Sequence, residues 1–369
     1  MEIKPFHPVP LSLEPQTDNW GEYAILSYKA TAALSRLAGM MDVSAKADLF
    51  WLTWLLKESQ CSNVIEGTVT TFDEVLGENA GIVIPVERQD DVREVINYRD
   101  ALNEGRAYID EGRPLNLSFI KALHALLLSG ARGQNKMPGK WRPIQVHIGK
   151  QGAPMDEAVY IPPEPVHIEL LLENWALFIK RDDINPLIQA AIMHAQFEMI
   201  HPFCDGNGRM GRLLISLFLV EKKVLTKPCF YMSAYLQEHR DKYYSSLANI
   251  SKKNDWKSWI EFFLEAIIER SNDNIKILQE MTELYEDSKN RFSEVTASAS
   301  AIQILDYIFA KPIFTLPDMQ RDDNINLTTQ AVIKILNKLE KASLIHKIAQ
   351  GRGRTPTIWE FTPLLKILR

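Results

Sequence analysis

The chain has 369 residues, of which 46% are hydrophobic and 24% are charged, and its formal net charge is −5. These values are those of an average globular protein, and they exclude a disordered or fibrous chain. The net charge gives no overall attraction to nucleic acid or to an anionic membrane. Cys61, Cys204 and Cys229 have no C-x-x-C spacing, so neither a disulfide framework nor a cysteine-rich zinc site is indicated.

The first residues, MEIKPFHPVPLSLEP, contain prolines where a signal peptide needs an uninterrupted apolar segment. No later apolar run approaches the length that spans a membrane. We therefore expect a cytoplasmic protein with no membrane partner. The prolines up to Pro15 predict an extended arm that lies across another surface.

Helical spacing of apolar residues dominates the chain, so the predicted fold class is mainly α. The first helical stretch is predicted from about Tyr23 to Gln60. Asn116 or Ser118 would cap a later helix that Gly130 ends. The further helices are predicted at 92–105, 115–129, 164–181, 186–200, 209–222, 240–251 and 256–287.

The residues between Pro138 and Pro163 have a different composition. The stretches PGKWRPIQVHIG and AVYIPP combine β-branched and aromatic residues with glycine and proline at their borders. This composition predicts a β-hairpin, from Trp141 to Tyr160, in an otherwise helical protein.

The last part of the chain predicts a second kind of module. After Ser293 the sequence indicates two helices, in SASAIQILDYIFAK and TTQAVIKILNKLEKASLI, followed by two short strands joined by a Gly/Arg turn. This order is typical of a winged helix-turn-helix domain.

One loop concentrates the residues that can carry chemistry. It reads HPFCDGNGRMGR, from His201 to Arg212, between two apolar helical segments. Gly206 and Gly208 flank Asn207, so successive backbone N–H groups can point the same way at the start of the next helix. This arrangement predicts a phosphate site, because a helix N-terminus attracts anions.

The charged residues of this loop fit the same chemistry. Arg209 and Arg212 are three positions apart, so both guanidinium groups could face one polyphosphate. Asp205 could hold Mg²⁺ beside the phosphates. A histidine has an unperturbed pKa near neutrality, so His201 could accept the proton of an incoming hydroxyl group.

Each residue of the loop taken singly also fits an ordinary structural role. His201 could end a helix, Asp205 and Asn207 could form turns, and the two arginines could be solvated helix charges. Their concentration in one short loop favours the phosphate site.

The stretch from His201 to Arg212 matches H-P-F-x-[DE]-G-N-G-R-x-x-R, so the chain resembles the Fic (Fido) family. The resemblance implies a helical core, transfer of AMP from Mg-ATP to a Ser, Thr or Tyr hydroxyl of a protein, and a flap that holds the target. The predicted hairpin from Trp141 to Tyr160 fits that flap. By position, His201 would be the base, Asp205 the magnesium ligand and the glycine-containing stretch the phosphate cradle.

A second stretch, SNVIEG from Ser62 to Gly67, is similar to the inhibitory pattern [ST]-x-x-x-E-[GN] of the same family. The resemblance implies that Glu66 pairs with Arg212 and removes a donor for the γ-phosphate, as in the subclass with an N-terminal inhibitory helix. The alternative is that Ser62 caps a helix and Glu66 is solvated. In some members the same glutamate serves the removal of AMP, and the sequence does not separate the two activities.

The resemblance also suggests that Tyr244 contacts the adenine base, although core packing is an alternative. Four other histidines, His124, His147, His167 and His194, have no metal-ligand spacing, and we assign them packing or surface roles. We expect an N-terminal arm and helical region (1–105), a catalytic core (106–290) and a winged-helix domain (291–369).

Other functions remain open. The loop contacts phosphates, so the donor nucleotide could differ from ATP, and a homodimer is possible. In a second class of function, an ATP-sensing regulator, the helix Thr328–Lys341 and a wing containing Arg352 and Arg354 would contact DNA. The acidic stretch from Asp318 to Asp323 argues against a broad DNA surface, so DNA contact is the less favoured interpretation.

Overall fold

The computed structural model of the protein describes residues 4–13, 20–44, 46–78, 80–130, 135–149, 152, 154–351 and 356–369. The described part of the chain is mainly helical, as predicted, with one small antiparallel sheet. Within it, no helix has both the length and the apolar character needed to cross a membrane.

The centre of the fold is a pair of antiparallel helices, α7 (Pro186–Ile200) and α8 (Asn207–Glu221). Both are buried on almost every side, which explains their nearly continuous apolar sequences. They are surrounded by α2 (Ala47–Ile65), α4 (Val86–Asp110), α5 (Leu117–Leu127), α6 (Ile168–Phe178), α9 (Ser233–Glu238) and α10 (Arg240–Lys253). The loop that joins α7 to α8 is the predicted phosphate site, so the core positions that loop at its surface.

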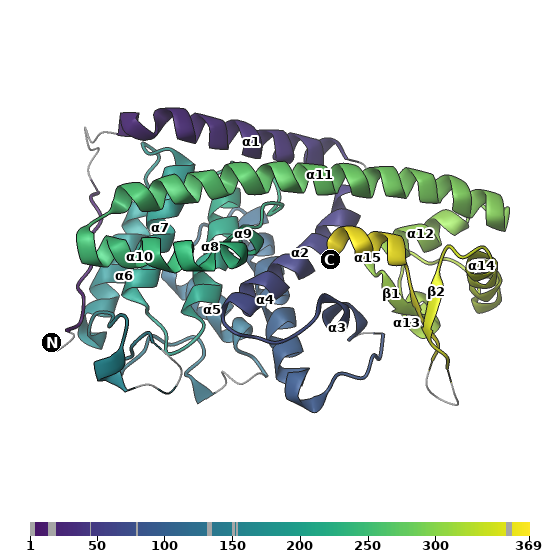
Figure 1. Ribbon diagram of the computed structural model, residues 1–369, viewed down its shortest axis with the longest axis horizontal. Coiled ribbons are helices and arrows are strands. Elements are labelled where there is room, and N and C mark those ends of the chain that lie inside the picture. Colours follow the sequence, from purple (N-terminus) through teal and green to yellow (C-terminus); the bar gives the residue numbers. More distant parts are fainter. Residues whose placement is uncertain are drawn as a thin grey trace.

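The longest helix, α11 (Trp256–Thr296), runs through the length of the molecule, and α1 (Ala24–Val43) lies alongside its first part (Figure 1). The helical stretch expected from about Tyr23 to Gln60 is present, but the chain divides it into α1 and α2. Ser44 adopts an extended conformation with ψ 118° at the end of α1. Asp, Val and Ser at this end are weak helix formers, which favours the break.

The residues that cap two of the helices are of the types that favour helix N-termini. Asn116 is the N-cap of α5, and its side chain accepts a hydrogen bond from the backbone N–H of Phe119 at 3.0 Å. A short helix, α3 (Phe72–Gly77), begins with a complete capping box made by Thr71 and Glu74. The two predicted domain boundaries, after 105 and after 290, fall inside α4 and α11, so these helices continue from one part into the next.

The predicted hairpin at 141–160 is present only in part in the described residues of this segment. It contains one isolated antiparallel bridge, between Ile148 and Tyr160, and no strand. The prolines of the segment lack the N–H donors that a strand ladder needs. Side chains satisfy its carbonyl groups instead: Arg142 donates to Ile144 O at 3.1 Å, and Gln145 donates to Pro162 O at 2.8 Å.

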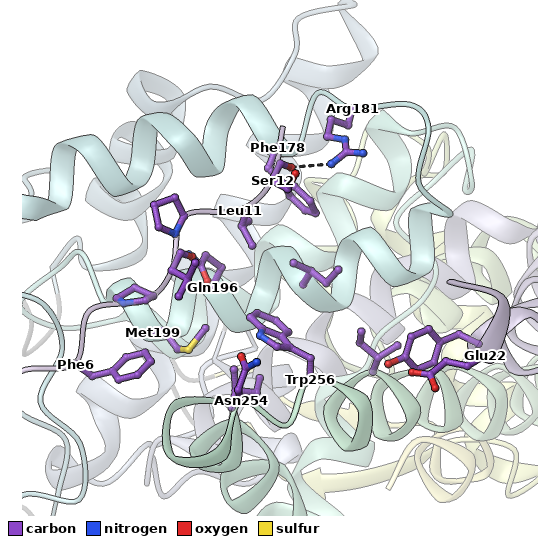
Figure 2. Close-up of a pocket in the computed structure, with 17 residues that line it drawn as sticks. Phe6, Leu11, Ser12, Glu22, Phe178, Arg181, Gln196, Met199, Asn254 and Trp256 are labelled. Carbon is purple, nitrogen blue, oxygen red and sulfur yellow. Dashed lines mark hydrogen bonds between the residues drawn. The ribbon is translucent and has the colours of Figure 1, made fainter. Parts of the chain in front are cut away.

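The N-terminal arm lies across α6 and α7, as the sequence predicts, although residues 14–19 are outside the described part. The backbone of Leu11 exchanges two hydrogen bonds with the side chain of Asn174, at 2.7 and 2.9 Å. Gln196 and Arg181 donate to carbonyl groups of the arm at 3.0 and 2.7 Å. The arm, α7 and the start of α11 enclose a largely apolar cavity of about 460 Å³ (Figure 2).

The C-terminal part contains the predicted helices and strands. Its elements are α12 (Ala301–Ala310), β1 (Ile313–Thr315), α13 (Leu316–Gln320), α14 (Thr329–Lys341), β2 (His346–Ala349), β3 (Ile358–Glu360) and α15 (Thr362–Leu368). The antiparallel sheet has the order β1-β3-β2. The predicted wing residues Arg352 and Arg354 lie outside the described residues. α12 and α15 both contact α2 (Figure 1).

Candidate functional site

The loop between α7 and α8 is closed by its own backbone and by one asparagine. Gly206 is the N-cap of α8 with φ 76°, a left-handed conformation that glycine adopts without strain. The side chain of Asn207 accepts from the N–H of Phe203 at 2.8 Å and donates to its carbonyl oxygen at 2.9 Å. The side chain of Asn207 therefore shapes the loop, and only its backbone N–H is available to an anion.

His201 is held in an unusual conformation at the end of α7. It has φ 51° and ψ 59°, which is uncommon for a residue with a side chain. Its Nδ1 lies 3.3 Å from the carbonyl oxygen of Glu198, which can only accept, so Nε2 is left as the proton acceptor. Burial lowers the pKa of His201 to about 4, and the imidazole is neutral at pH 7.

Arg142 fixes the backbone on which His201 stands. Its guanidinium is almost fully buried and donates to carbonyl oxygens only: His201 O at 2.8 Å, Pro163 O at 2.5 Å and Ile144 O at 3.1 Å. The backbone N–H of Arg142 also donates to Pro202 O at 2.9 Å. Arg142 could not be predicted from the sequence, because no spacing relates it to the loop.

His124 supports the other end of the loop. Its Nδ1 accepts from the N–H of Gly139 at 2.9 Å, so its Nε2 carries the proton and donates to Asp205 O at 2.9 Å. Its ring stacks on Phe203 with the ring centres 3.5 Å apart. Burial lowers the pKa of His124 to about 4. His124 therefore has the packing role expected of it, but it packs against the loop itself.

Arg212, Ser62 and Glu66 form one cluster between α8 and the end of α2, in which Arg212 and Ser62 are buried and the side chain of Glu66 is 35% exposed. Arg212 Nη2 lies 2.6 Å from Glu66 Oε1, and Arg212 Nε donates to Ser62 Oγ at 2.9 Å. Burial opposes ionisation of Glu66, but Arg212 outweighs it and holds the pKa of Glu66 below its usual range. The carboxylate also lies against Gly208, where a side chain would collide with it. The predicted pairing of Glu66 with Arg212 is present.

Arg209 has a different set of partners from Arg212, and the expectation that both face one polyphosphate stays a prediction. Arg209 Nη1 lies 3.0 Å from Glu94 Oε2 and 3.4 Å from Asn63 Oδ1. Its Nε is buried and has no hydrogen-bond partner among the described residues. Each arginine is therefore paired with its own glutamate, and no pattern in the sequence indicated the contribution of Glu94 on α4.

Asp205 fits the predicted magnesium ligand in its exposure and donor type. Its Oδ1 accepts from the N–H of Gly206 at 2.6 Å and lies 3.4 Å from Arg209 Nη2. The side chain is 41% exposed. Mg²⁺ usually takes one or two carboxylates together with substrate phosphates, so a single accessible carboxylate at a phosphate site is suitable.

Tyr244 lies at the surface of α10, with 41% of its area exposed, beside Arg240, whose guanidinium is 5.6 Å from its ring centre. Burial raises the pKa of its hydroxyl, and the charge of Glu66 adds to this effect, which places Tyr244 near the cluster of Arg212, Ser62 and Glu66. The preceding Tyr243 is a core residue that shares a 2.9 Å hydrogen bond with His194. Tyr244 is thus the accessible member of the pair.

Comparison with known proteins agrees with this geometry. The family described as "Fic/DOC family" matches residues 114–219, and "Fic/DOC family N-terminal" matches residues 26–107. The protein adenylyltransferase fic-1 of Caenorhabditis elegans is 27% identical over 210 residues, which is 53% of this chain and 38% of that protein. A probable protein adenylyltransferase of Aquifex aeolicus is 34% identical over 91 residues, 24% of this chain and 26% of that protein. The chain thus spans less than two fifths of these relatives.

Solved structures share the fold. A Fic family protein from Desulfovibrio desulfuricans matches 96% of this chain and 98% of its own, with a TM-score of 0.59 and 20% identity. Fic-1 of C. elegans (residues 134–508) matches 72% of this chain and 75% of its own, with a TM-score of 0.54 and 19% identity. At these identities the likeness concerns the fold alone.

Proposed function

The chain belongs to the Fic/DOC family, and from that premise we propose that it transfers AMP from ATP to a Ser, Thr or Tyr hydroxyl group of a protein. The hydroxyl oxygen would attack the α-phosphorus, the bond to pyrophosphate would break, and the proton would pass to Nε2 of His201. The neutral state of His201 supports this role, because a base must be unprotonated before the reaction.

The start of α8 supports the binding of the phosphates. The first backbone N–H groups of a helix have no partners within it and carry its positive dipole end. Gly206 and Gly208 leave these groups without covering side chains, and Arg212 adds forked donors. Asp205 would hold Mg²⁺, which neutralises phosphate charge when it is bound.

The segment 141–160 supports a role in holding the target protein. Ile144, Ile148 and Val159 expose 59%, 37% and 61% of their areas, and the segment is joined to the loop through Arg142. Its backbone is little engaged in regular pairing, so an extended peptide could add to it by main-chain hydrogen bonds. The modified hydroxyl group would then lie next to His201.

We further propose that Glu66 inhibits the enzyme. Its carboxylate is paired with Arg212, which is a donor of the proposed phosphate site, and it lies against Gly208. The carboxylate therefore competes with a phosphate for the same donors. The position of this carboxylate, paired with Arg212 and against Gly208, is the observation that carries the proposal. Removal of Glu66 frees Arg212, and in-line attack on the α-phosphorus then becomes possible.

The test measures label transferred to protein from α-labelled ATP with Mg²⁺. Glu66→Gly should label strongly, the wild type weakly, and Glu66→Gly with His201→Ala should not label. Glu111→Gly is a matched control, because Glu111 is also a helix C-cap, with φ −75° and ψ 2° against −84° and 2° for Glu66. It should behave as the wild type.

An unlabelled Glu66→Gly variant that still binds ATP would contradict AMP transfer to this protein itself. Other labelled nucleotides and a target that already carries AMP would then distinguish another donor from the reverse reaction. Strong, steeply salt-dependent retention on random DNA would instead favour the regulator, because phosphate contacts release counterions.

A further inference from the structure

Two histidines and a glutamate meet where the N-terminal arm crosses the segment after the proposed flap. His7 Nε2 lies 3.0 Å from Glu164 Oε2, and His167 Nε2 lies 4.0 Å from the same oxygen. One ligand atom from each residue lies within 4.8 Å of the other two. From this geometry we infer that His7, Glu164 and His167 form a zinc site, which is separate from the proposed phosphate site in the loop.

The spacing of the three groups is compatible with a shared ion. Ligand atoms about 2.0–2.2 Å from zinc at tetrahedral angles lie about 3.3–3.6 Å from one another. The two contacts to Glu164 lie on either side of this value. The 3.0 Å contact with His7 is also an ordinary ion-pair distance. What favours a shared ion is that Glu164 Oε2 is shielded from solvent and has no hydrogen-bond partner within the described residues, so its contact with His7 lacks hydrogen-bond geometry. A cation between the three groups would satisfy this oxygen.

The three ligands stand on backbone that is already fixed. The N–H of Phe6, next to His7, donates to Ile161 O at 2.9 Å. Pro163, next to Glu164, accepts from the buried guanidinium of Arg142 at 2.5 Å. His167 ends the 3-10 turn Pro165–His167. Little ordering of the chain is therefore needed on binding, which favours affinity.

The donor set selects the metal class. Two imidazoles and one carboxylate suit Zn²⁺, and Mg²⁺ and Ca²⁺ prefer oxygen ligands alone. The side chains of His7, Glu164 and His167 are 52%, 42% and 48% exposed, so a water molecule can complete the tetrahedron. The ion would join the arm to the segment that Arg142 links to His201.

The experiment uses the full chain without a polyhistidine tag, freed of metal by a chelator. Calorimetric titration with Zn²⁺ should give one site per chain, and Co²⁺ should give the visible absorption of a tetrahedral complex. His7→Ala, Glu164→Gln and His167→Ala should each weaken Zn²⁺ binding by more than about tenfold, since loss of even an outer-shell partner typically costs 10–100-fold. His346→Ala, which removes an exposed histidine of β2, should bind as the wild type.

A second readout separates metal binding from misfolding. Zn²⁺ should raise the Tm of the wild type and of His346→Ala, because it binds the folded state, and should leave the Tm of His7→Ala unchanged. The inference is overturned if the wild type binds no Zn²⁺. It is equally overturned if the three variants retain wild-type affinity, which would place the ion elsewhere.

Discussion

The carboxylate of Glu66 lies directly over the Cα of Gly208, so a methyl group at position 208 would meet both Glu66 Oε1 and Arg212 Nη1. Gly208→Ala should therefore separate Glu66 from Arg212 and lower the free energy of unfolding by about 1–3 kcal/mol, the usual cost of overpacking. The same change in a Glu66→Gly background should cost less, because the colliding carboxylate is gone. Thermal unfolding of the four proteins in this double-mutant cycle measures the difference, and equal costs in both backgrounds would show that Glu66 does not rest on Gly208.

Ser62 should contribute to inhibition by orienting Arg212. Ser62→Ala removes the acceptor of Arg212 Nε, a loss of about 1–3 kcal/mol for a buried hydrogen bond to a charged group. We expect label transfer from ATP to rise above the wild type but to stay below Glu66→Gly. Ser59→Ala is the control, because Ser59 is equally buried on α2 and donates only to Leu55 O of its own helix. Equal labelling of the two serine variants would contradict this role.

Arg142 should affect the rate through the position of His201. Arg142→Lys keeps the charge but cannot reach His201 O, Pro163 O and Ile144 O together. In a Glu66→Gly background we expect the initial rate of labelling to fall about 10²-fold, the effect of a displacement of about 1 Å at a catalytic group. ATP affinity should change little, because Arg142 contacts carbonyl oxygens only. Arg113→Lys, at an exposed arginine, is the control, and a parallel loss of ATP binding would contradict a positioning role.

The local parts of the site could be predicted from the sequence, because they depend on neighbours in the chain. The loop from His201 to Arg212 and the pattern from Ser62 to Glu66 each lie in one short stretch, and the pairing of Glu66 with Arg212 followed from the family resemblance. The N-cap at Asn116 could be predicted for the same reason, because its hydrogen bond joins residues only three positions apart. Partners that are far apart in the chain could not be predicted in this way. Glu94 pairs with Arg209 across 115 positions, and no spacing identifies that pair.

The segment 141–160 shows where composition misleads. Its β-branched and aromatic residues favour strands, yet the carbonyl groups of Ile144 and Val146 accept from the side chains of Arg142 and Gln145. Strand propensity measures how a residue packs on a sheet, and in the described residues the two sides of this segment pair only at the bridge between Ile148 and Tyr160. The predicted hairpin is therefore reduced to one bridge in the described part of the segment.

Buried groups with displaced pKa values predict how stability depends on pH. Burial lowers the pKa of His124 to about 4 and that of His194 to about 3, so below pH 6.5 the unfolded state binds more protons and stability falls as the pH falls. Burial raises the pKa of Glu58 to about 7 and that of Glu198 to about 8. Above the ordinary value of 4.5 these two carboxyl groups keep protons in the folded state only, so they reduce stability as the pH rises.

Above pH 6.5 His124 and His194 no longer contribute to the pH dependence of stability, which is then set by Glu58 and Glu198. We therefore expect the free energy of unfolding to decrease between pH 6.5 and 8. Glu198→Gln should make that decrease smaller by about 1–2 kcal/mol. A carboxyl group that stays protonated only in the folded state lowers the free energy of unfolding by about 1.4 kcal/mol per pH unit, and for Glu198 this continues up to about pH 8. Denaturant unfolding at pH 6.5, 7 and 8 measures it, with Glu173→Gln on the exposed side of α6 as the control. A slope in Glu198→Gln as steep as in the wild type would show that the Glu198 carboxyl is already ionised in the folded protein at pH 6.5.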